Sequence, residues 1–323
     1  MRKVTPKCGF GVTFLMETVA IFRICGTLVK EYKRKGLICM VTLKNDVMTV
    51  SITEFGAEMQ NITAADGTQY LWHGDPKYWA GRAPVLFPNC GRMFDDKYCY
   101  EGKEYTLPIH GFAKYYDFEV ESATETEAVF LLRDNAETRK MYPFAFEFRV
   151  RYALDGDSIV ITYDVHNPST DKPLLASWGS HEAYVCPEGL TAYDVVFEKE
   201  EPLNSHYVGK GITHATYPVE APDGVLPLKD EYFTIDALVF RYLQSKEISL
   251  RNRETGRGVK VNFDGIETLL IWTKPGAPYV CIEPWCGLPC WEDFDGNLEN
   301  KEGIRHIAAG ETCSAKHIIT LLP

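Results

Sequence analysis

The chain has 323 residues, of which 45% are hydrophobic and 24% are charged, a composition typical of a globular protein with a sizeable core. Its formal net charge of −11 argues against nucleic acid or an anionic membrane as a partner, because both repel an acidic surface. The length is compatible with two domains, but a large all-β sandwich also reaches it as one.

Residues 1–39 do not share the pattern of the rest of the chain. A basic start is followed by the short apolar stretch CGFGVTFLM, as in a signal peptide. Glu17 and Arg23 follow in the same segment and no small-residue cleavage site is clear, which disfavours secretion and membrane anchoring. We interpret 1–39 as an extension, either a peripheral helix or a start-site artefact, before one domain over 40–323.

From residue 41 onward, apolar and polar side chains alternate with the period of β-strands. Turn residues such as Asn45-Asp46 and Asp155-Gly156-Asp157 separate the strands of hairpins. Hairpins are predicted over 41–52, 117–134 and 146–165, and further strands over 259–263, 268–273 and 279–283. No long segment after residue 40 has helical periodicity. The pattern predicts an all-β fold, a large antiparallel β-sandwich.

The ten cysteines give no sign of a metal site or a disulfide framework, since no CxxC pair appears. The densest group is Cys281, Cys286 and Cys290, whose spacing is not the tight paired spacing of structural zinc sites. We therefore expect reduced thiols, a cytoplasmic location and no metal.

Chemistry is expected where the strand pattern breaks, because loops carry most functional groups. Four such segments stand out, at 82–93, 107–112, 177–184 and 281–288. The sequence contains no Gly-rich phosphate loop, no HExxH and no GxSxG, so that no nucleotide cofactor is expected and a serine hydrolase is disfavoured.

Glu283 ends the apolar run YVCIE and is followed by Pro284 and Trp285. Desolvation beside an aromatic side chain would raise the pKa of this carboxylate toward that of a useful base. The alternative is a strand-end glutamate paired with an arginine.

Two histidines lie in similar contexts. His181 is flanked by Trp178 and Tyr184, and His110 precedes Gly111, which permits close approach of a ligand to the backbone. Either imidazole could instead be a core side chain that is bonded to the backbone.

Arg92 and Asp236 complete the candidates. The guanidinium of Arg92 offers a planar fork of donors, although a surface ion pair would explain it equally well. Asp236 lies between apolar neighbours, where a carboxylate needs a partner or a ligand.

Taken together, these segments resemble the aldose 1-epimerase (galactose mutarotase-like) family, and in particular its divergent bacterial branch. Arg92, Tyr98, the run GKEYTL over 102–107 and His110-Gly111 follow one another in the order of the family motif. The resemblance runs from about residue 41 to the C-terminus.

The resemblance implies an isomerase with the supersandwich fold that interconverts the α and β anomers of a free aldose without a cofactor. The family's second histidine falls on His181 and its catalytic glutamate on Glu283. By resemblance, Glu283 would remove the proton of the C1 hydroxyl while His181 protonates the ring oxygen.

The remaining candidates would bind substrate. The hydroxyl-binding aspartate of the family falls on Asp236, and Arg92 and His110 would hold further hydroxyls. Trp178 or Trp285 would stack on a face of the sugar.

The chain departs from the family pattern at three places. Gly91 replaces the usual asparagine, HGF replaces HGG, and the Pro-Trp context of Glu283 differs from that of galactose-specific members. Because of these differences, the resemblance does not identify which sugar is the substrate. A hexose-6-phosphate mutarotase, for which Arg82 is the obvious extra cation, and a non-catalytic sugar-binding module are the alternatives. A glycosidase would need a second carboxylate. The expected partner is a monosaccharide, and the oligomeric state is not indicated.

Deleting residues 1–39 should leave a folded and active domain, because regular strand patterning begins near Met40. Circular dichroism and mutarotation of the truncated protein, beside the full chain, check this expectation. An aggregated or inactive truncation would instead indicate that the extension packs against the domain.

Overall fold

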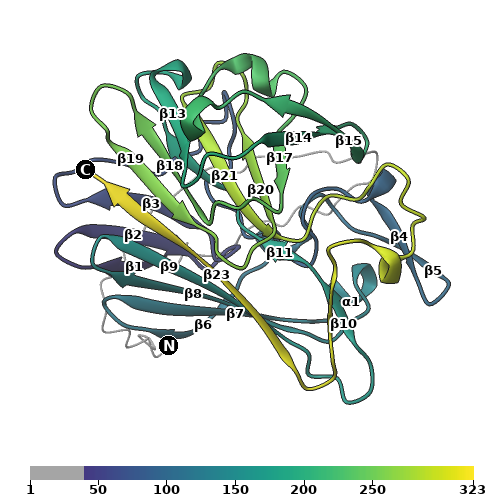
Figure 1. Cartoon of the computed structure of the whole chain (residues 1–323). Coiled ribbons are helices and arrows are strands. Elements are labelled where there is room, and N and C mark those ends of the chain that lie inside the picture. Colours follow the sequence, from purple (N-terminus) through teal and green to yellow (C-terminus); the bar gives the residue numbers. More distant parts are fainter. Residues whose placement is uncertain (1–39) are drawn as a thin grey trace, which may run out of the picture.

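The computed structural model describes residues 40–323, and antiparallel β-strands supply most of their regular structure (Figure 1). The predicted all-β fold is confirmed, and the one α-helix of this range, α1 (Thr138–Met141), is a single turn. The extension expected over 1–39 lies outside the described residues. Within 40–323, no helix has the length and apolar character needed to cross a membrane.

The larger sheet has nine strands. In β8 (Glu147–Asp155) and β9 (Ser158–His166) every second side chain is buried, as expected for strands with one face on a core. In sheet order the strands are β16 (Val225–Pro227), β13 (Tyr193–Phe197), β18 (Glu247–Asn252), β19 (Gly258–Asn262), β23 (Thr312–Leu322), β9 (Ser158–His166), β8 (Glu147–Asp155), β7 (Glu127–Arg133) and β6 (Glu119–Ala123). Yellow in Figure 1, β23 lies in the middle, bonded to β19 on one side and to β9 on the other.

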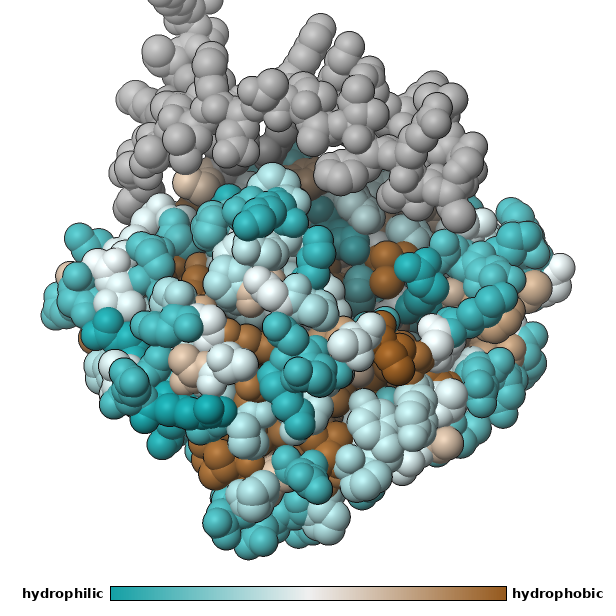
Figure 2. Space-filling model, turned by 90° about the horizontal axis from the view of Figure 1, so that it is seen from above, coloured by the Kyte–Doolittle hydropathy of each residue, from teal (hydrophilic) through white to brown (hydrophobic). Residues whose placement is uncertain are grey.

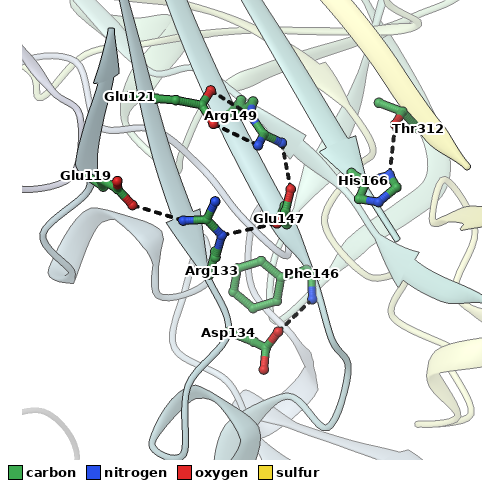
Figure 3. Close-up of polar contacts among 9 residues, drawn as sticks. All are labelled: Glu119, Glu121, Arg133, Asp134, Phe146, Glu147, Arg149, His166 and Thr312. Atoms are coloured by element: carbon green, nitrogen blue, oxygen red, sulfur yellow. Dashed lines mark hydrogen bonds and ion pairs between the residues drawn. The ribbon is translucent and has the colours of Figure 1, made fainter. Parts of the chain in front are cut away.

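Ion pairs mark the outer face of this sheet near its β6 edge (Figure 3). Arg133 on β7 contacts Glu119 at 2.9 Å and Glu147 at 3.1 Å. Arg149 on β8 bonds to Glu121 and also to Glu147, each at 2.9 Å. Water screens such exposed pairs, so each contributes little to stability. The other residues of β8, which alternate with Glu147 and Arg149 along the strand, therefore point to the core.

The smaller sheet has five strands. They are β11 (Trp178–Gly179), β12 (Glu182–Val185), β21 (Tyr279–Cys286), β20 (Thr268–Trp272) and β17 (Leu238–Arg241), with β11 and β12 both paired to β21. All residues of β21 are buried. Val280 and Ile282 join the core cluster that also contains side chains of the nine-stranded sheet, whereas Cys281 belongs to a separate cluster on the other face.

The remaining strands form small sheets around these two. They are β1 (Met40–Lys44), β2 (Met48–Thr53) and β3 (Met59–Ala64), and the pairs β4 (Lys97–Tyr100) with β5 (Lys103–Thr106), β10 (Leu174–Ala176) with β22 (Arg305–Ile307), and β14 (Leu203–Val208) with β15 (Ile212–Val219). Short 3-10 turns are η1 (Phe94–Asp96), η2 (Ala113–Tyr115), η3 (Leu190–Ala192), η4 (Pro222–Gly224), η5 (Asp230–Phe233) and η6 (Leu298–Asn300).

The three predicted hairpins are present as β1–β2, β6–β7 and β8–β9. At the first turn, the side-chain oxygen of Asn45 accepts hydrogen bonds from the amides of Val47 and Met48 at 2.9 and 2.8 Å. This is the local chemistry for which asparagine is favoured in turns.

Seen from above, the described surface shows mostly hydrophilic side chains with small hydrophobic areas between them (Figure 2). The large apolar side chains that the described residues expose are those of Val47, Tyr115, Tyr207, Ile235 and Tyr242. Single exposed apolar side chains are ordinary on a protein surface.

A buried polar pair joins the two sheets through the core. His317 on β23 lies with its Nε2 atom 3.2 Å from Oε1 of Glu182 on β12, and the ring of Tyr163 stacks on the imidazole. Both His317 and Glu182 are buried. A polar pair placed here fixes how the five-stranded sheet sits on β23, because neither group finds water if the contact is lost.

Replacing His317 with alanine should cost about 3–5 kcal/mol of the free energy of unfolding, since it leaves a buried carboxylate without its partner. Denaturant unfolding measures this loss. The matched control is Arg133→Ala on the outer face, which should cost far less. The double variant Glu182→Leu with His317→Leu should recover much of the loss, and a double variant less stable than His317→Ala would contradict this account.

Candidate active site

Glu283 lies on the face of β21 that points away from the main core. Cys281, two residues before Glu283, and Trp285, two residues after it, project to the same face because side chains alternate along a strand. Glu283 is 2% exposed. Its backbone partner on β20 is Leu270, so that an apolar strand lies on one side of the carboxylate.

His181 reaches Glu283 because the strands before and after it both pair with β21. The register places Gly179 opposite Trp285 and Glu182 opposite Ile282. His181 lies between β11 and β12, and its Nε2 atom is 3.4 Å from Oε2 of Glu283. The two residues that the sequence singled out for acid and base chemistry are therefore neighbours.

Burial sets the protonation of this pair. Loss of hydration raises the pKa of Glu283 well above its usual range, and the negative charges of Asp236 and Glu182 add to the rise. Burial also lowers the pKa of His181 to about 3, with the nearby Lys114 ammonium as the second cause. The 3.4 Å contact acts against both shifts, because opposite charges stabilise each other. The pair thus behaves as one coupled unit that holds one proton, on the carboxyl or on the imidazole.

Aromatic rings enclose the imidazole of His181. Trp79 stacks on it with ring centroids 4.9 Å apart, and Trp272 meets it edge-on at 5.7 Å. Trp285 packs closely over Gly179, where an added Cβ would lie 2.8 Å from the indole. The indole N–H of Trp285 donates to the carbonyl of Ser180 at 3.0 Å, which fixes the ring beside the pair.

His110 faces the same place from another loop. Its ring lies 5.3 Å from that of His181 and 5.4 Å from that of Trp285, in both cases edge to face. His110 and Gly111 both have positive φ, and an added Cβ at Gly111 would lie 2.1 Å from the carbonyl oxygen of Phe87. Glycine is therefore required at position 111, where this loop turns. Nδ1 of His110 accepts a hydrogen bond from the amide of Gly91 at 3.2 Å.

Burial lowers the pKa of His110 well below its usual value, and the charges of Lys114, His181 and Arg92 act in the same direction. The neutral imidazole, with Nδ1 as acceptor, keeps the Nε2 hydrogen free to donate to a ligand. This suits His110 to holding a sugar hydroxyl.

Arg92 and Asp236 lie near the other candidates, since the charge of Arg92 acts on His110 and that of Asp236 acts on Glu283. Arg92 forms an ion pair with Asp96 at 3.0 Å, and half of its side chain is exposed. Oδ1 of Asp236 accepts from the amide of Ala237 at 2.8 Å. Desolvation raises the pKa of the Asp236 carboxyl, against the opposing effects of that hydrogen bond and of the Arg92 charge.

Trp178 is not brought into the site. It is 1% exposed and belongs to the main core cluster, together with Ile282 and Cys286. On β11 and the bend that follows, His181 has the opposite parity to Trp178, so the two side chains project to opposite faces. Trp178 therefore packs in the core, and the sugar-stacking role that the sequence suggested for it does not fit this position.

Sequence reasoning did not single out Trp79, Trp272 or Lys114. Trp79 lies in an irregular, aromatic-rich segment, which was an available signal, whereas Trp272 only ends an apolar strand. Lys114 follows the His110 loop in η2, and burial lowers its pKa to about 8. Its charge acts on both His110 and His181, so it belongs to the surroundings of the site.

The three cysteines at 281–290 do not converge. Cys281 and Cys286 project to opposite faces of β21 and belong to different clusters. All seven cysteines of the described range are free thiols. Within that range, a different set could hold a metal ion, namely His181, Cys281 and Glu283, whose donor atoms all lie within 4.8 Å of one another.

Comparisons with known proteins agree with this architecture. The profile of the aldose 1-epimerase family matches residues 40–290. The plasmid-encoded protein LacX of Lactococcus lactis subsp. lactis is 32% identical over 296 residues, which cover 87% of this chain and 99% of LacX.

Two solved structures are similar in fold and sequence. The galactose mutarotase related enzyme of Lactobacillus acidophilus is 33% identical with a TM-score of 0.83, over 88% of this chain and 97% of that one. A galactose mutarotase-like protein of Lactobacillus casei ATCC 334 is 26% identical with a TM-score of 0.82, over 88% and 100%.

Proposed function

The chain belongs to the aldose 1-epimerase family, and on that premise we propose that it is a mutarotase that interconverts the α and β anomers of a free aldose. The resemblance seen in the order of the motifs is thereby confirmed. The single observation that carries the proposal is the 3.4 Å contact between His181 and Glu283 in a buried, aromatic-lined position.

Mutarotation needs one proton removed and another delivered. In the proposed mechanism, Glu283 takes the proton of the C1 hydroxyl while His181 gives a proton to the ring oxygen, and the C1–O5 bond breaks. The open aldehyde rotates about C1–C2 and closes by the reverse steps. The pair begins and ends with one proton in total, so no cofactor is consumed.

Other side chains would hold the sugar within reach of this pair, so that its C1 hydroxyl and ring oxygen are oriented toward the base and the acid. Arg92, His110 and Asp236 are assigned to hydroxyl groups, since the His110 ring lies 5.3 Å from that of His181, and the charges of Arg92 and Asp236 act on His110 and Glu283 respectively. Trp285 offers an aromatic face. We also propose a cytoplasmic location, which the free thiols support.

A sugar phosphate is the second candidate substrate, and Lys114 favours it. This ammonium is partly buried, and its charge acts on both histidines of the site. A mutarotation screen over free and 6-phosphorylated hexoses and pentoses separates the two substrates. A protein that binds sugar without changing the rate on any of them would be a binding module instead.

Glu283→Gln and His181→Asn should each lower kcat by about 10²–10⁴-fold, the usual contribution of general acid or base catalysis. The affinity of each variant for the sugar should fall far less than kcat, because the hydroxyl-binding side chains remain. Polarimetry of freshly dissolved α-anomer, over a range of sugar concentrations, gives both parameters. The double variant should be little worse than the poorer single one, since the two groups act as a unit.

Arg92→Ala and Asp236→Ala are the matched variants for this experiment, and they should chiefly raise KM. Arg133→Ala, far from the site on the outer sheet face, should change neither parameter. A near-normal kcat in folded Glu283→Gln would refute its assignment as the base.

Dialysis against a chelator should not lower the mutarotation rate, because acid and base are both side chains. The measurement compares the dialysed protein with an untreated sample at equal concentration. Activity that falls on chelation and returns with zinc would contradict this mechanism.

A further inference from the structure

We propose that His181, Cys281 and Glu283 form a binding site for a thiophilic divalent cation of the Zn²⁺ or Co²⁺ class, and that its occupation inhibits the enzyme. The donor atoms of the three side chains all lie within 4.8 Å of one another. The inhibitory effect rests on the proposed mutarotase function, whereas the binding itself does not.

The backbone explains why these donors converge. Cys281 and Glu283 are two residues apart on β21, so their side chains lie on one face of the strand. The loop between β11 and β12 brings His181 over the same face, with Nε2 pointing at the carboxylate. Three donors from two neighbouring backbone segments thus meet without any change of fold.

The donor set is selective. Thiolate, imidazole and carboxylate are all ligands of Zn²⁺, and three protein ligands with an open fourth position are typical of accessible zinc sites. A sulfur donor disfavours Mg²⁺ and Ca²⁺, which prefer oxygen. Two of the donors are anionic when they coordinate, which balances the charge of a divalent ion in this buried position.

Coordination would replace the direct contact between His181 and Glu283 with bonds to the ion. Within residues 40–323, Cys281 is a free thiol and Nδ1 of His181 has no hydrogen-bond partner. Cys281 is fully buried, beside the aromatic cluster that contains Tyr279.

Occupation removes the groups that the reaction needs. A metal ion bound to the carboxylate oxygen occupies the lone pair that would accept the C1 hydroxyl proton, and its bond to the imidazole nitrogen displaces the proton that His181 would give to the ring oxygen. The ion also holds both side chains in one position. Zn²⁺ should therefore lower the rate reversibly, and a chelator should restore it.

The test is a titration of the full chain with Co²⁺, followed by the thiolate-to-cobalt charge-transfer absorbance in the near ultraviolet, which needs no enzymatic activity. Cys281→Ser keeps the size of the side chain and removes the thiolate. Cys286→Ser is the matched control, because Cys286 lies on the same strand but faces the main core. Circular dichroism confirms that each variant is folded, and Cys281→Ala replaces Cys281→Ser if the latter is not.

The wild type and Cys286→Ser should show the band, and Cys281→Ser should not. Basal mutarotation should be retained in Cys281→Ser. The Zn²⁺ concentration that halves the rate should rise by more than the roughly 10–100-fold that loss of an outer-shell partner costs.

A folded wild type without the band, or a band that survives in Cys281→Ser, overturns the metal site. Equal sensitivity to Zn²⁺ in the wild type and Cys281→Ser overturns the inhibitory role. A normal band in a protein without mutarotase activity supports the site and refutes the proposed function, so the two failures are distinguishable.

Discussion

The pleat of β21 sends alternate side chains into two environments, and the side chains are buried in both. Val280 and Ile282 pack against the main core, which holds the strand at a fixed height and rotation. The same packing fixes the backbone positions of the residues on the other face, Cys281, Glu283 and Trp285. Because the strand cannot rotate without emptying the core, the carboxylate keeps its position relative to His181.

The same sheet carries two buried carboxylates on opposite faces, and they serve different ends. Glu182, opposite Ile282 in the register, points into the core and is paired with His317. Glu283 points to the site and is paired with His181, which is 8% exposed. A buried carboxylate beside an imidazole is thus structural on one face of the sheet and, in our proposal, catalytic on the other. The pairing chemistry is the same, and the two imidazoles differ in burial, since His317 is 0% exposed and His181 is 8% exposed.

Strand existence could be predicted from the sequence, whereas the face to which each side chain points could be predicted only where polar and apolar residues alternate. The hairpin β8–β9 alternates polar and apolar residues, so its buried face was readable in advance. Sequence YVCIE has no such alternation, because both faces of β21 are buried, and the different surroundings of Cys281 and Cys286 were invisible. Trp178 was assigned to the sugar for the same reason. Trp79 approaches His181 only through tertiary packing, which no local pattern encodes.

The position of β23 has a consequence for biosynthesis. This strand joins the half of the large sheet that ends at β19 to the half that ends at β9, yet it is translated after both. Until its residues leave the ribosome, β9 and β19 each present an unpaired edge, which is prone to association with other chains. The nascent protein therefore depends on the last strand to close its sheet, and nascent-chain chaperones have their greatest opportunity to act just before it emerges.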